Sequence, residues 1–402
     1  MTVIKSLHEL HDLRKQNLST YLEHVKEILE HVRTYGDDGL IELTKRFDGI
    51  TIRDIVVEPK ELKDMAESTP DDVKTSIDLL YEYLQSLNKE VLPKDFIVRD
   101  GEYSSGIIWR PIDSVGIYVP GGLKAYPSTL LMAAVPAKVA GVERLYIGTP
   151  PRFRGEIDPA VAYISLKLKV SKVYRVGGAQ IIAAMAYGTK SVDKVDKVVG
   201  PGNIYVQLAK FLLQDTISID GVEGPTELFV IADESANPIE ICLDMEAQAE
   251  HGTTTINALF TPSDELLNGV ETCLKSSMNK FFLIEVENIE EAVELVNSLA
   301  PEHLSLRTRN PYSILGKIRN VGAISIGRTP SAIIDYLGPN HILPTNGSAR
   351  FRGGLSVYDF IKTVMVVDGV PKPELLSAAR TLANYEGFNL HGKSIGVLYG
   401  HT

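Results

Sequence analysis

Cysteine is almost absent from this sequence of 402 residues. It occurs only at Cys242 and Cys273, too few for a disulfide framework or for a zinc site built on thiolates. Both cysteines lie in segments with helical spacing of apolar residues, where neither is well placed to act as a nucleophile. We therefore expect neither a disulfide-stabilised fold nor thiolate chemistry.

Basic blocks and long apolar runs are missing as well. The formal net charge of -11 and the lack of a basic cluster argue against nucleic acid as the main partner. No apolar run is long enough to cross a membrane, and Met1–Leu10 lacks the charged-then-apolar pattern of a signal peptide. With 44% hydrophobic and 23% charged residues, the chain is predicted to be a soluble cytoplasmic protein of two or three domains.

Histidine is absent between His31 and His251. The early histidines (His8, His11, His24 and His31) lie in a polar stretch with helical spacing and no other ligand types nearby, which is typical of a solvated helix. Candidate functional histidines are therefore those from His251 onward.

The segment before Phe96 has largely helical spacing, whereas strands and helices alternate after it. Glycine-rich turns follow three of the predicted strands, at Gly121-Gly122, Gly177-Gly178 and Gly200-Pro-Gly202. Strand, glycine-rich turn, helix and strand form a βαβ unit, which predicts parallel sheets. Such turns let the backbone approach a ligand, and the helix N-termini beyond them favour phosphate. The usual dinucleotide fingerprint GxGxxG is missing, and a Gly-Gly turn alone most often only reverses the chain.

Gln248 and His251 are three residues apart at the end of a predicted helix, so both side chains project from one face. An amide oxygen and an imidazole are both workable ligands for zinc. Alone, the pair is typical of a solvated helix face. Further ligand types follow in three later segments: Glu302-His303, Asp335 with His341, and Glu386 with His391.

Eight motifs occur in a fixed order along most of the chain, and together they resemble histidinol dehydrogenase. They are Tyr118-Val-Pro-Gly-Gly, Val176-Gly-Gly-Ala-Gln180, Val199-Gly-Pro-Gly-Asn203, Glu223-Gly-Pro-Thr226-Glu, Gln248-Ala-Glu-His251, Pro301-Glu-His303-Leu, Asp335-Tyr-Leu-Gly-Pro-Asn-His341-Ile-Leu-Pro and Glu386-Gly-Phe-Asn-Leu-His391.

The resemblance implies a zinc-dependent oxidation of L-histidinol, through the aldehyde, to L-histidine with two NAD. It also implies a homodimer whose C-terminal segment reaches the partner's site. The implied zinc ligands are Gln248, His251, Asp335 and His391, and the implied NAD contacts are Tyr118, Gln180 and Asn203. Glu302 and His303 match the catalytic pair, and the substrate positions are Thr226, His341 and Glu386 together with His303 and the zinc ligands.

Elementary chemistry agrees with these roles. Two imidazoles and two oxygens form a nitrogen and oxygen site, whose open positions would hold the substrate so that the metal serves mainly as a template. His303 suits a base that takes the alcohol proton, and Glu302 can activate water for the second oxidation. The chain departs from the family at several places, among them Thr226, which replaces the usual Ser, and the interval from Asp335 to His341, which is one residue short.

The predicted fold is α/β, with two Rossmann-like lobes that have parallel-sheet cores and with small helical extensions at both ends. We assign residues 1–15 to an N-terminal helical extension, 16–117 and 227–347 to a discontinuous first lobe, 118–226 to a second lobe that contacts NAD, and 348–402 to a tail that reaches the partner. The active site is expected between the lobes, near the carboxyl ends of the strands.

Three alternatives remain open on the residues alone. One is an aldehyde dehydrogenase that forms a thiohemiacetal on cysteine, which the positions of Cys242 and Cys273 disfavour. Another is a zinc hydrolase with Glu302 as the base, which would produce no NADH. The third is a non-catalytic scaffold, and the presence of every ligand and of both members of the catalytic pair argues against it.

Overall fold

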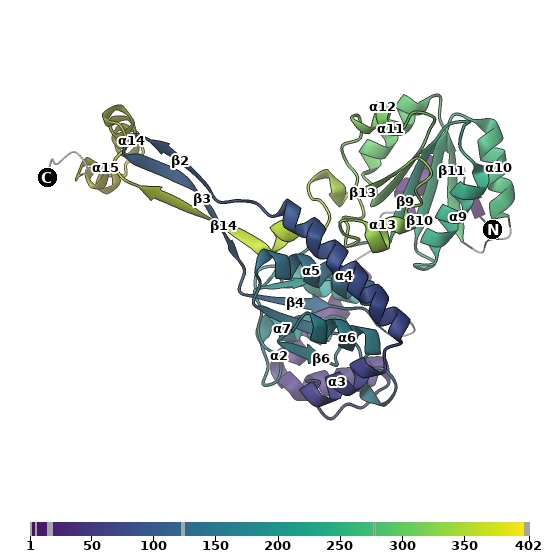
Figure 1. The fold of residues 1–402 in the computed structure, drawn as a ribbon, viewed down its shortest axis with the longest axis horizontal. Coiled ribbons are helices and arrows are strands. Elements are labelled where there is room, and N and C mark those ends of the chain that lie inside the picture. The colour runs from purple at the N-terminus through teal and green to yellow at the C-terminus, as the bar shows by residue number, and fades with distance from the viewer. Residues whose placement is uncertain are drawn as a thin grey trace.

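The computed structural model describes residues 2–4, 6–13, 19–121, 125–275, 277 and 279–397. Gly122 of the first predicted glycine-rich turn lies outside these ranges. Figure 1 shows two lobes, each with helices on both faces of a sheet, and an arm that extends away from both. The α/β fold class with two parallel-sheet lobes is therefore confirmed.

The first sheet, in what we call the five-stranded lobe, is parallel and has the order β6-β5-β4-β7-β8. Its central strand is buried throughout, and Gly116 within it allows α7 to pack closely, because a Cβ there would lie 2.5 Å from Met185 Sδ. The strands are β4 (Ser114–Tyr118), β5 (Arg144–Gly148), β6 (Lys172–Tyr174), β7 (Lys197–Val199) and β8 (Ser218–Ile219).

Helices cover this sheet in two layers. The inner pairs are α5 (Pro127–Ala140) with α6 (Pro159–Lys167) on one face, and α7 (Gly178–Tyr187) with α8 (Ile204–Leu212) on the other. Outside them, α2 (Ser19–Asp48) packs on α7 and α8, while α3 (Pro59–Glu67) and α4 (Asp71–Val91) pack on α6 and α5.

The prediction that residues 16–117 form one lobe together with residues 227–347 is therefore wrong. The helices of this segment cover the five-stranded sheet, and β4 is its central strand. Helical spacing shows which face of a helix is buried, but it does not show which sheet that face covers.

The second sheet, in the six-stranded lobe, is parallel with the order β1-β11-β10-β9-β12-β13. One face packs on α9 and α10, and the other on α1, α11 and α12. The strands are β1 (Thr2–Ile4), β9 (Glu227–Ala232), β10 (Ile256–Thr261), β11 (Lys280–Glu285), β12 (His303–Arg307) and β13 (Ala323–Ile326). The helices of this lobe are α1 (Leu7–Leu13), α9 (Pro238–Ala249), α10 (Asp264–Leu274), α11 (Ile289–Leu299), α12 (Tyr312–Leu315) and α13 (Ala332–Leu337).

The N-terminal segment 1–15, predicted as a helical extension, is only partly helical. Its first described residues form β1, which pairs with β11 and adds an edge strand to the six-stranded sheet. A strand of three residues is too short to show a period in the sequence, which explains why it was missed.

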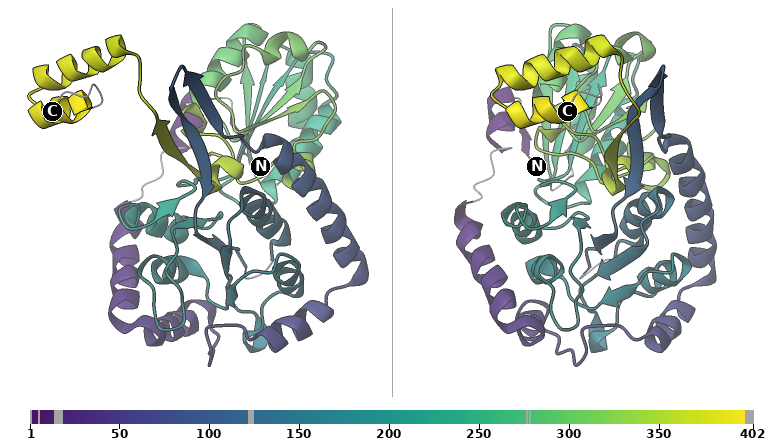
Figure 2. Two further views of the ribbon diagram at one scale, coloured as in Figure 1. Left: turned by 60° about the vertical axis from the view of Figure 1, so that its left-hand side comes forward. Right: turned by 90° about the vertical axis from the view of Figure 1, so that its left-hand side faces the viewer.

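The arm is a three-stranded antiparallel sheet that carries a helical hairpin at its far end (Figures 1 and 2). It consists of β2 (Phe96–Asp100), β3 (Tyr103–Pro111), β14 (Ile361–Asp368), α14 (Pro373–Tyr385) and α15 (Asn389–Gly396). Short 3-10 turns lie at Phe153–Gly155, Ser348–Arg350 and Val357–Phe360. The C-terminal segment from residue 348 is thus more than a helical tail, because β14 pairs with β3 from Ser104 to Pro111 and the arm is built from both halves of the chain.

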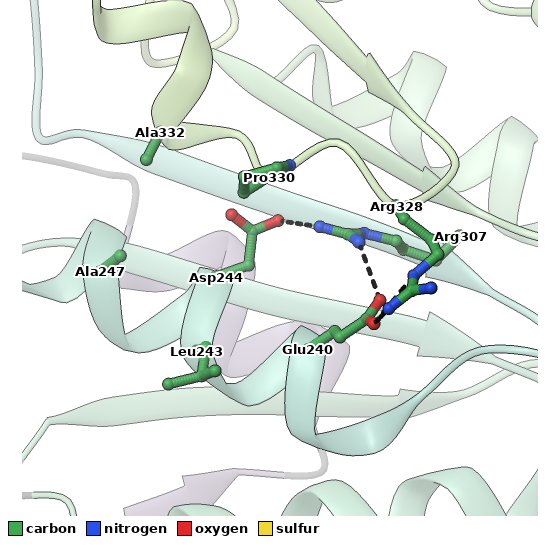
Figure 3. A pocket seen from close by; sticks show the side chains of 8 residues that line it. All are labelled: Glu240, Leu243, Asp244, Ala247, Arg307, Arg328, Pro330 and Ala332. Carbon is green, nitrogen blue, oxygen red and sulfur yellow. Dashed lines mark hydrogen bonds and ion pairs between the residues drawn. The ribbon is translucent and has the colours of Figure 1, made fainter.

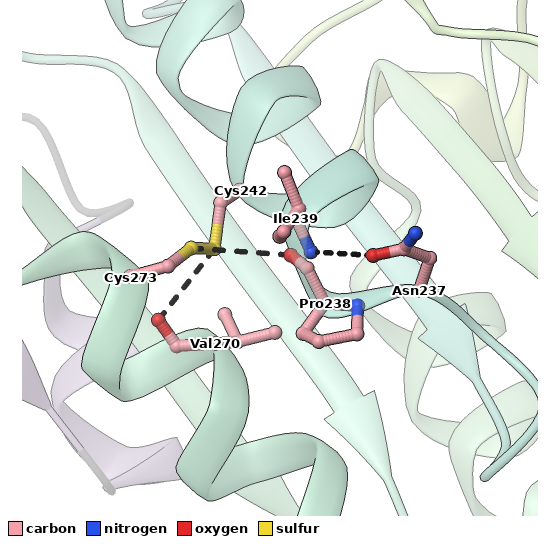
Figure 4. The surroundings of a disulfide bond; sticks show 6 residues. All are labelled: Asn237, Pro238, Ile239, Cys242, Val270 and Cys273. Atoms are coloured by element: carbon pink, nitrogen blue, oxygen red, sulfur yellow. Dashed lines mark hydrogen bonds between the residues drawn. A yellow bond between two sulfur atoms is a disulfide. The ribbon is translucent and has the colours of Figure 1, made fainter.

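Cys242 and Cys273 form a disulfide between α9 and α10 (Figure 4), with their Cα atoms 6.6 Å apart. Two cysteines allow no disulfide framework, and this single bond between them was not foreseen from the sequence. Two cysteines separated by 31 residues carry no sequence signal of proximity, because only the packing of the two helices brings them together. Within the described ranges, no helix has the length and apolar character needed to cross a bilayer.

We expect the double substitution Cys242→Ser and Cys273→Ser to lower the free energy of unfolding. Closing a loop of this length restricts the unfolded chain and is worth about 3.5 kcal/mol. Denaturant unfolding measures the loss, and mass spectrometry after alkylation should find no free thiol in the unreduced protein. A reducing agent should destabilise the wild type but not the double variant. Free thiols in the native, unreduced protein would contradict the bond.

Candidate active site

In the six-stranded lobe, the predicted site residues lie at the amino ends of the strands. Thr226 directly precedes β9, His251 lies shortly before β10, and His303 is the first residue of β12. The expectation that the site lies at carboxyl ends is wrong for this lobe. Helices α9 and α11 end at this edge, so their carbonyl ends place partial negative charge there, which favours a bound cation.

In the five-stranded lobe, the predicted NAD contacts do lie at carboxyl ends. Tyr118 ends β4, Gln180 lies in the first turn of α7 after β6, and Asn203 follows β7. Tyr118 and Gln180 are buried, and burial raises the pKa of Tyr118 to about 12, against a hydrogen bond with the Gly178 backbone that lowers it. The exposed Asn203 caps α8, because its Oδ1 accepts from the N–H groups two and three residues on, at 3.1 and 3.2 Å.

Two of the four predicted metal ligands, His251 and Asp335, lie close to each other within one chain, and Gln248 lies one turn before His251. Gln248 lies in the last turn of α9, His251 follows the helix, and Asp335 lies in α13, with His251 Nε2 3.9 Å from Asp335 Oδ2. Gln248 is buried, and its Nε2 has no hydrogen-bond partner among the described residues. An amide turned about its last torsion would present its oxygen there instead. A buried polar atom without a partner, an imidazole and a carboxylate together fit a borderline divalent cation.

The surroundings of Asp335 keep it ionised. Burial alone would raise the pKa of this carboxyl, but the nearby imidazoles of His251, His303 and His341 outweigh burial and lower it. A carboxylate that is charged at neutral pH is the form that binds a metal ion.

The fourth predicted ligand, His391, lies on α15, and the predicted substrate contact Glu386 follows α14. Both are exposed and belong to the end of the arm, which points away from α9 and α13 (Figures 1 and 2). In the described part of a single chain, no three His, Cys, Asp or Glu residues are arranged to hold a metal ion. One chain therefore does not bring all four predicted ligands together.

Glu302 and His303, the predicted catalytic pair, are both buried. Glu302 Oε2 accepts the Glu227 N–H at 2.9 Å, and Glu227 Oε2 accepts the Glu302 N–H at 3.3 Å. Burial raises the pKa of Glu302 well above its usual value, and the charges of Glu227, Glu223 and Asp335 raise it further. Burial lowers the pKa of His303 to about 4. His303 Nε2 lies 3.8 Å from Glu302 Oε1 and 4.0 Å from Asp335 Oδ1.

His341 joins this cluster to the other lobe. One ring nitrogen, Nδ1, lies 2.7 Å from the Asp335 carbonyl oxygen, and Nε2 lies 3.2 Å from Thr129 Oγ1 in the first turn of α5. Asn340 Nδ2 also donates to the Met132 carbonyl of α5 at 2.6 Å. The shortened interval after Asp335 therefore still leaves His341 beside the predicted site, at the junction of the lobes.

A buried ion pair that the sequence analysis missed holds the turn before Asn203. Lys210 Nζ lies 2.5 Å from Asp220 Oδ1 and donates to the Gly200 carbonyl at 2.9 Å. Asp220 Oδ2 accepts the Gly200 N–H at 2.7 Å, so the pair binds both the N–H and the carbonyl group of Gly200. The sequence carried one signal for this ion pair, namely a lysine within a largely apolar helix, where a buried charge needs a partner.

Comparison with known proteins shows the family to which the chain belongs. The sequence profile of histidinol dehydrogenase matches residues 12–398. The histidinol dehydrogenase of Saccharolobus solfataricus is 50% identical over 389 residues, covering 96% of this chain and 98% of the relative. The chain belongs to the histidinol dehydrogenase family. The histidinol dehydrogenase of Sulfurisphaera tokodaii is 48% identical over 396 residues, covering 98% of this chain and 99% of the relative.

A solved structure supports the same assignment. The crystal structure of histidinol dehydrogenase from Elizabethkingia anophelis superposes with a TM-score of 0.90 at 30% identity, covering 99% of this chain and 97% of that one. Membership of the histidinol dehydrogenase family makes the protein an oxidoreductase, which sets aside the hydrolase and the scaffold. A thiohemiacetal on cysteine is disfavoured as well, because Cys242 and Cys273 are joined to each other.

We expect Glu302→Gln to stabilise the metal-free protein more at pH 8 than at pH 5. Because the pKa of Glu302 is raised in the fold, its favourable contribution is complete below the unfolded value of 4.5 and is lost as pH rises through the folded pKa. The amide removes that loss and can still accept the Glu227 N–H.

Thermal unfolding at the two pH values measures this difference. Glu290→Gln is the control, because Glu290 is exposed and lies 3.0 Å from Lys317 Nζ, so its amide should bring no gain at pH 8. A Glu302→Gln variant with the same change in Tm at both values would contradict the raised pKa.

Proposed function

We propose that the protein oxidises L-histidinol to L-histidine through L-histidinaldehyde, with zinc and two NAD, as the last steps of histidine biosynthesis in the cytoplasm. Family membership supports the overall reaction. The observation that carries the site is the meeting of His251, His303 and Asp335 with Glu302, linked by separations of 3.8 to 4.0 Å. These side chains come from three segments of the chain: the end of α9, the start of β12 and α13.

The metal would be held by Gln248, His251 and Asp335, with His391 of the partner subunit completing the set. Zinc would supply a template that holds the imidazole and amine of the substrate. Thr226, His341 and Glu386 of the partner subunit would contact the substrate around it. The unpartnered Nε2 of the buried Gln248 supports this assignment, because a buried amide normally has its polar atoms satisfied.

NAD would lie against the five-stranded lobe, at Tyr118, Gln180 and Asn203. Two helices begin there, α7 at Gly178 and α8 at Ile204, and their N–H groups carry the partial positive charge that a pyrophosphate requires. The raised pKa of Tyr118 keeps its hydroxyl protonated, so that it can donate a hydrogen bond to the cofactor.

His303 would act as the base of the first oxidation. Its lowered pKa leaves the imidazole neutral at pH 7, so it can accept the hydroxyl proton of the alcohol while hydride passes to NAD. The aldehyde then adds water, and oxidation of the hydrate gives the carboxylate with a second hydride transfer. Glu302 would take the proton of that water, and its raised pKa makes the ionised carboxylate a stronger base.

In a homodimer, the arm of one subunit would supply residues to the site of the other. Large apolar side chains are exposed there, including Met365 at 80%, Tyr385 at 88% and Leu390 at 76%. An apolar surface exposed to solvent in this way favours association with another protein surface. A two-fold symmetric contact would place the arm of each subunit on the other. Glu386 and His391 would then act in the partner's site.

The proposal is tested by NADH formation from L-histidinol before and after chelation. We expect NADH to form, to fall to background when bound metal is removed, and to return when zinc is added. Metal analysis of the untreated protein should find zinc in proportion to subunits. Histidinol turnover without NADH, or undiminished NADH formation in the metal-free protein, would contradict the proposal.

The division of labour between Glu302 and His303 is tested by Glu302→Gln in a single turnover. We expect the variant to form NADH from the alcohol but to stop at the aldehyde, so that it yields half the NADH of the wild type. His303→Gln is the matched variant and should slow the first hydride transfer. If Glu302→Gln reduced both hydride transfers equally, the two residues would not have separate roles.

A further inference from the structure

Asp244 is a buried carboxylate of α9 that joins this helix to two other elements. It is 3% exposed. Its Oδ1 accepts the N–H of Ser331 at 2.7 Å and the hydroxyl of Ser331 at 2.6 Å. Its Oδ2 accepts from Arg307 Nη2 at 2.8 Å and from Ser305 Oγ at 3.4 Å. Ser331 immediately precedes α13, and Ser305 and Arg307 lie on β12, so one side chain connects α9, α13 and β12.

Each connected element carries a residue of the proposed site at a fixed offset from its contact with Asp244. On α9, Gln248 follows Asp244 by four residues, about one helical turn. Asp335 follows Ser331 by four residues, within α13. On β12, His303 precedes Ser305 by two residues, so both side chains leave the strand on the same side.

A pocket of about 310 Å³ opens beside Asp244 between α9 and the segment that leads into α13 (Figure 3). Its lining residues are Glu240, Leu243, Asp244, Ala247, Arg307, Arg328, Pro330 and Ala332. Beside this pocket, two carboxylates of α9 connect the helix to its neighbours. Glu240 binds Arg328 and lies 3.7 Å from Arg307 Nη1, and the buried Asp244 binds Ser331 and Arg307.

We propose that Asp244 is the positioning residue that holds Gln248, Asp335 and His303 in register for metal and substrate. The expected effect on zinc binding rests on the proposed function, whereas the junction of α9, α13 and β12 at Asp244 is seen in the structure without it. Asp244 would touch neither metal nor substrate and would act only through the elements it joins.

Asn at this position tests the proposal, because it keeps the size of the side chain but carries two donors on one side. One side of Asp244 faces the Ser331 donors and the other faces the Arg307 guanidinium, so an amide must oppose donor to donor on one of them. Asp233→Asn is the matched control. Asp233 Oδ1 accepts from Ser235 N and Oγ at 3.0 and 2.5 Å, and Oδ2 accepts the Arg309 N–H at 2.8 Å, just beyond the carboxyl end of β9.

We expect Asp244→Asn to lower zinc affinity about 10- to 100-fold in competition with a chromophoric chelator, as substitutions behind metal ligands do. Asp233→Asn should leave zinc affinity unchanged. In the metal-free protein, the imidazole nitrogen resonances of His251 and His303 should shift in Asp244→Asn and stay in place in Asp233→Asn. Ser331→Ala, which removes only the hydroxyl contact, should give a smaller change of the same kind.

Unchanged zinc affinity and unshifted resonances in a folded Asp244→Asn protein would overturn the proposal. Equal losses in the Asp244 and Asp233 variants would also overturn it, because the effect would then be one of general stability. If Asp244→Asn does not fold, Ser331→Ala decides in its place by the same two measurements. Failure of the wild type to bind zinc or to form NADH would instead overturn the proposed function, and the imidazole resonances would still decide the role of Asp244.

Discussion

The burial of ionisable groups at the amino edge of the six-stranded sheet is the constraint on which the site depends. A buried carboxyl ionises only where donors or positive charge surround it. Asp335 has imidazoles around it and a lowered pKa, whereas Glu302 faces other carboxyls and has a raised pKa. The pKa values of these neighbouring carboxyls are thereby shifted in opposite directions, which separates the proposed metal ligand from the proposed acid–base group.

The two lobes present opposite helix ends to the site. In the six-stranded lobe, α9 and α11 end at the edge that holds the proposed catalytic pair, whereas α7 and α8 of the five-stranded lobe begin beside the proposed NAD contacts. Carbonyl ends favour a cation and N–H ends favour phosphate, so each lobe is suited to one charged group. The segment around His341 joins the lobes through α5, which brings these two edges together.

Local features were predictable from the sequence, and long-range pairings were not. Asn288 caps the start of α11, because its Oδ1 accepts the Glu291 N–H at 2.9 Å, and an asparagine at this place before a helical run is a signal that the sequence carries. The lobe covered by α2, α3 and α4, the edge strand β1 and the disulfide were missed, because each depends on segments that meet only after folding. The motifs selected residues that do lie close together, namely His251, His303, Asp335 and His341. Glu386 and His391 lie on the arm, away from this cluster within one chain.

The central claim is that one metal site is assembled from two subunits, and anomalous diffraction at the zinc edge tests it most directly. Crystals of the zinc-bound protein should show one strong peak per subunit, within bonding distance of Gln248, His251 and Asp335 and of His391 of the partner subunit. A peak elsewhere, or one at these three residues with the partner's His391 far from it, would contradict the account.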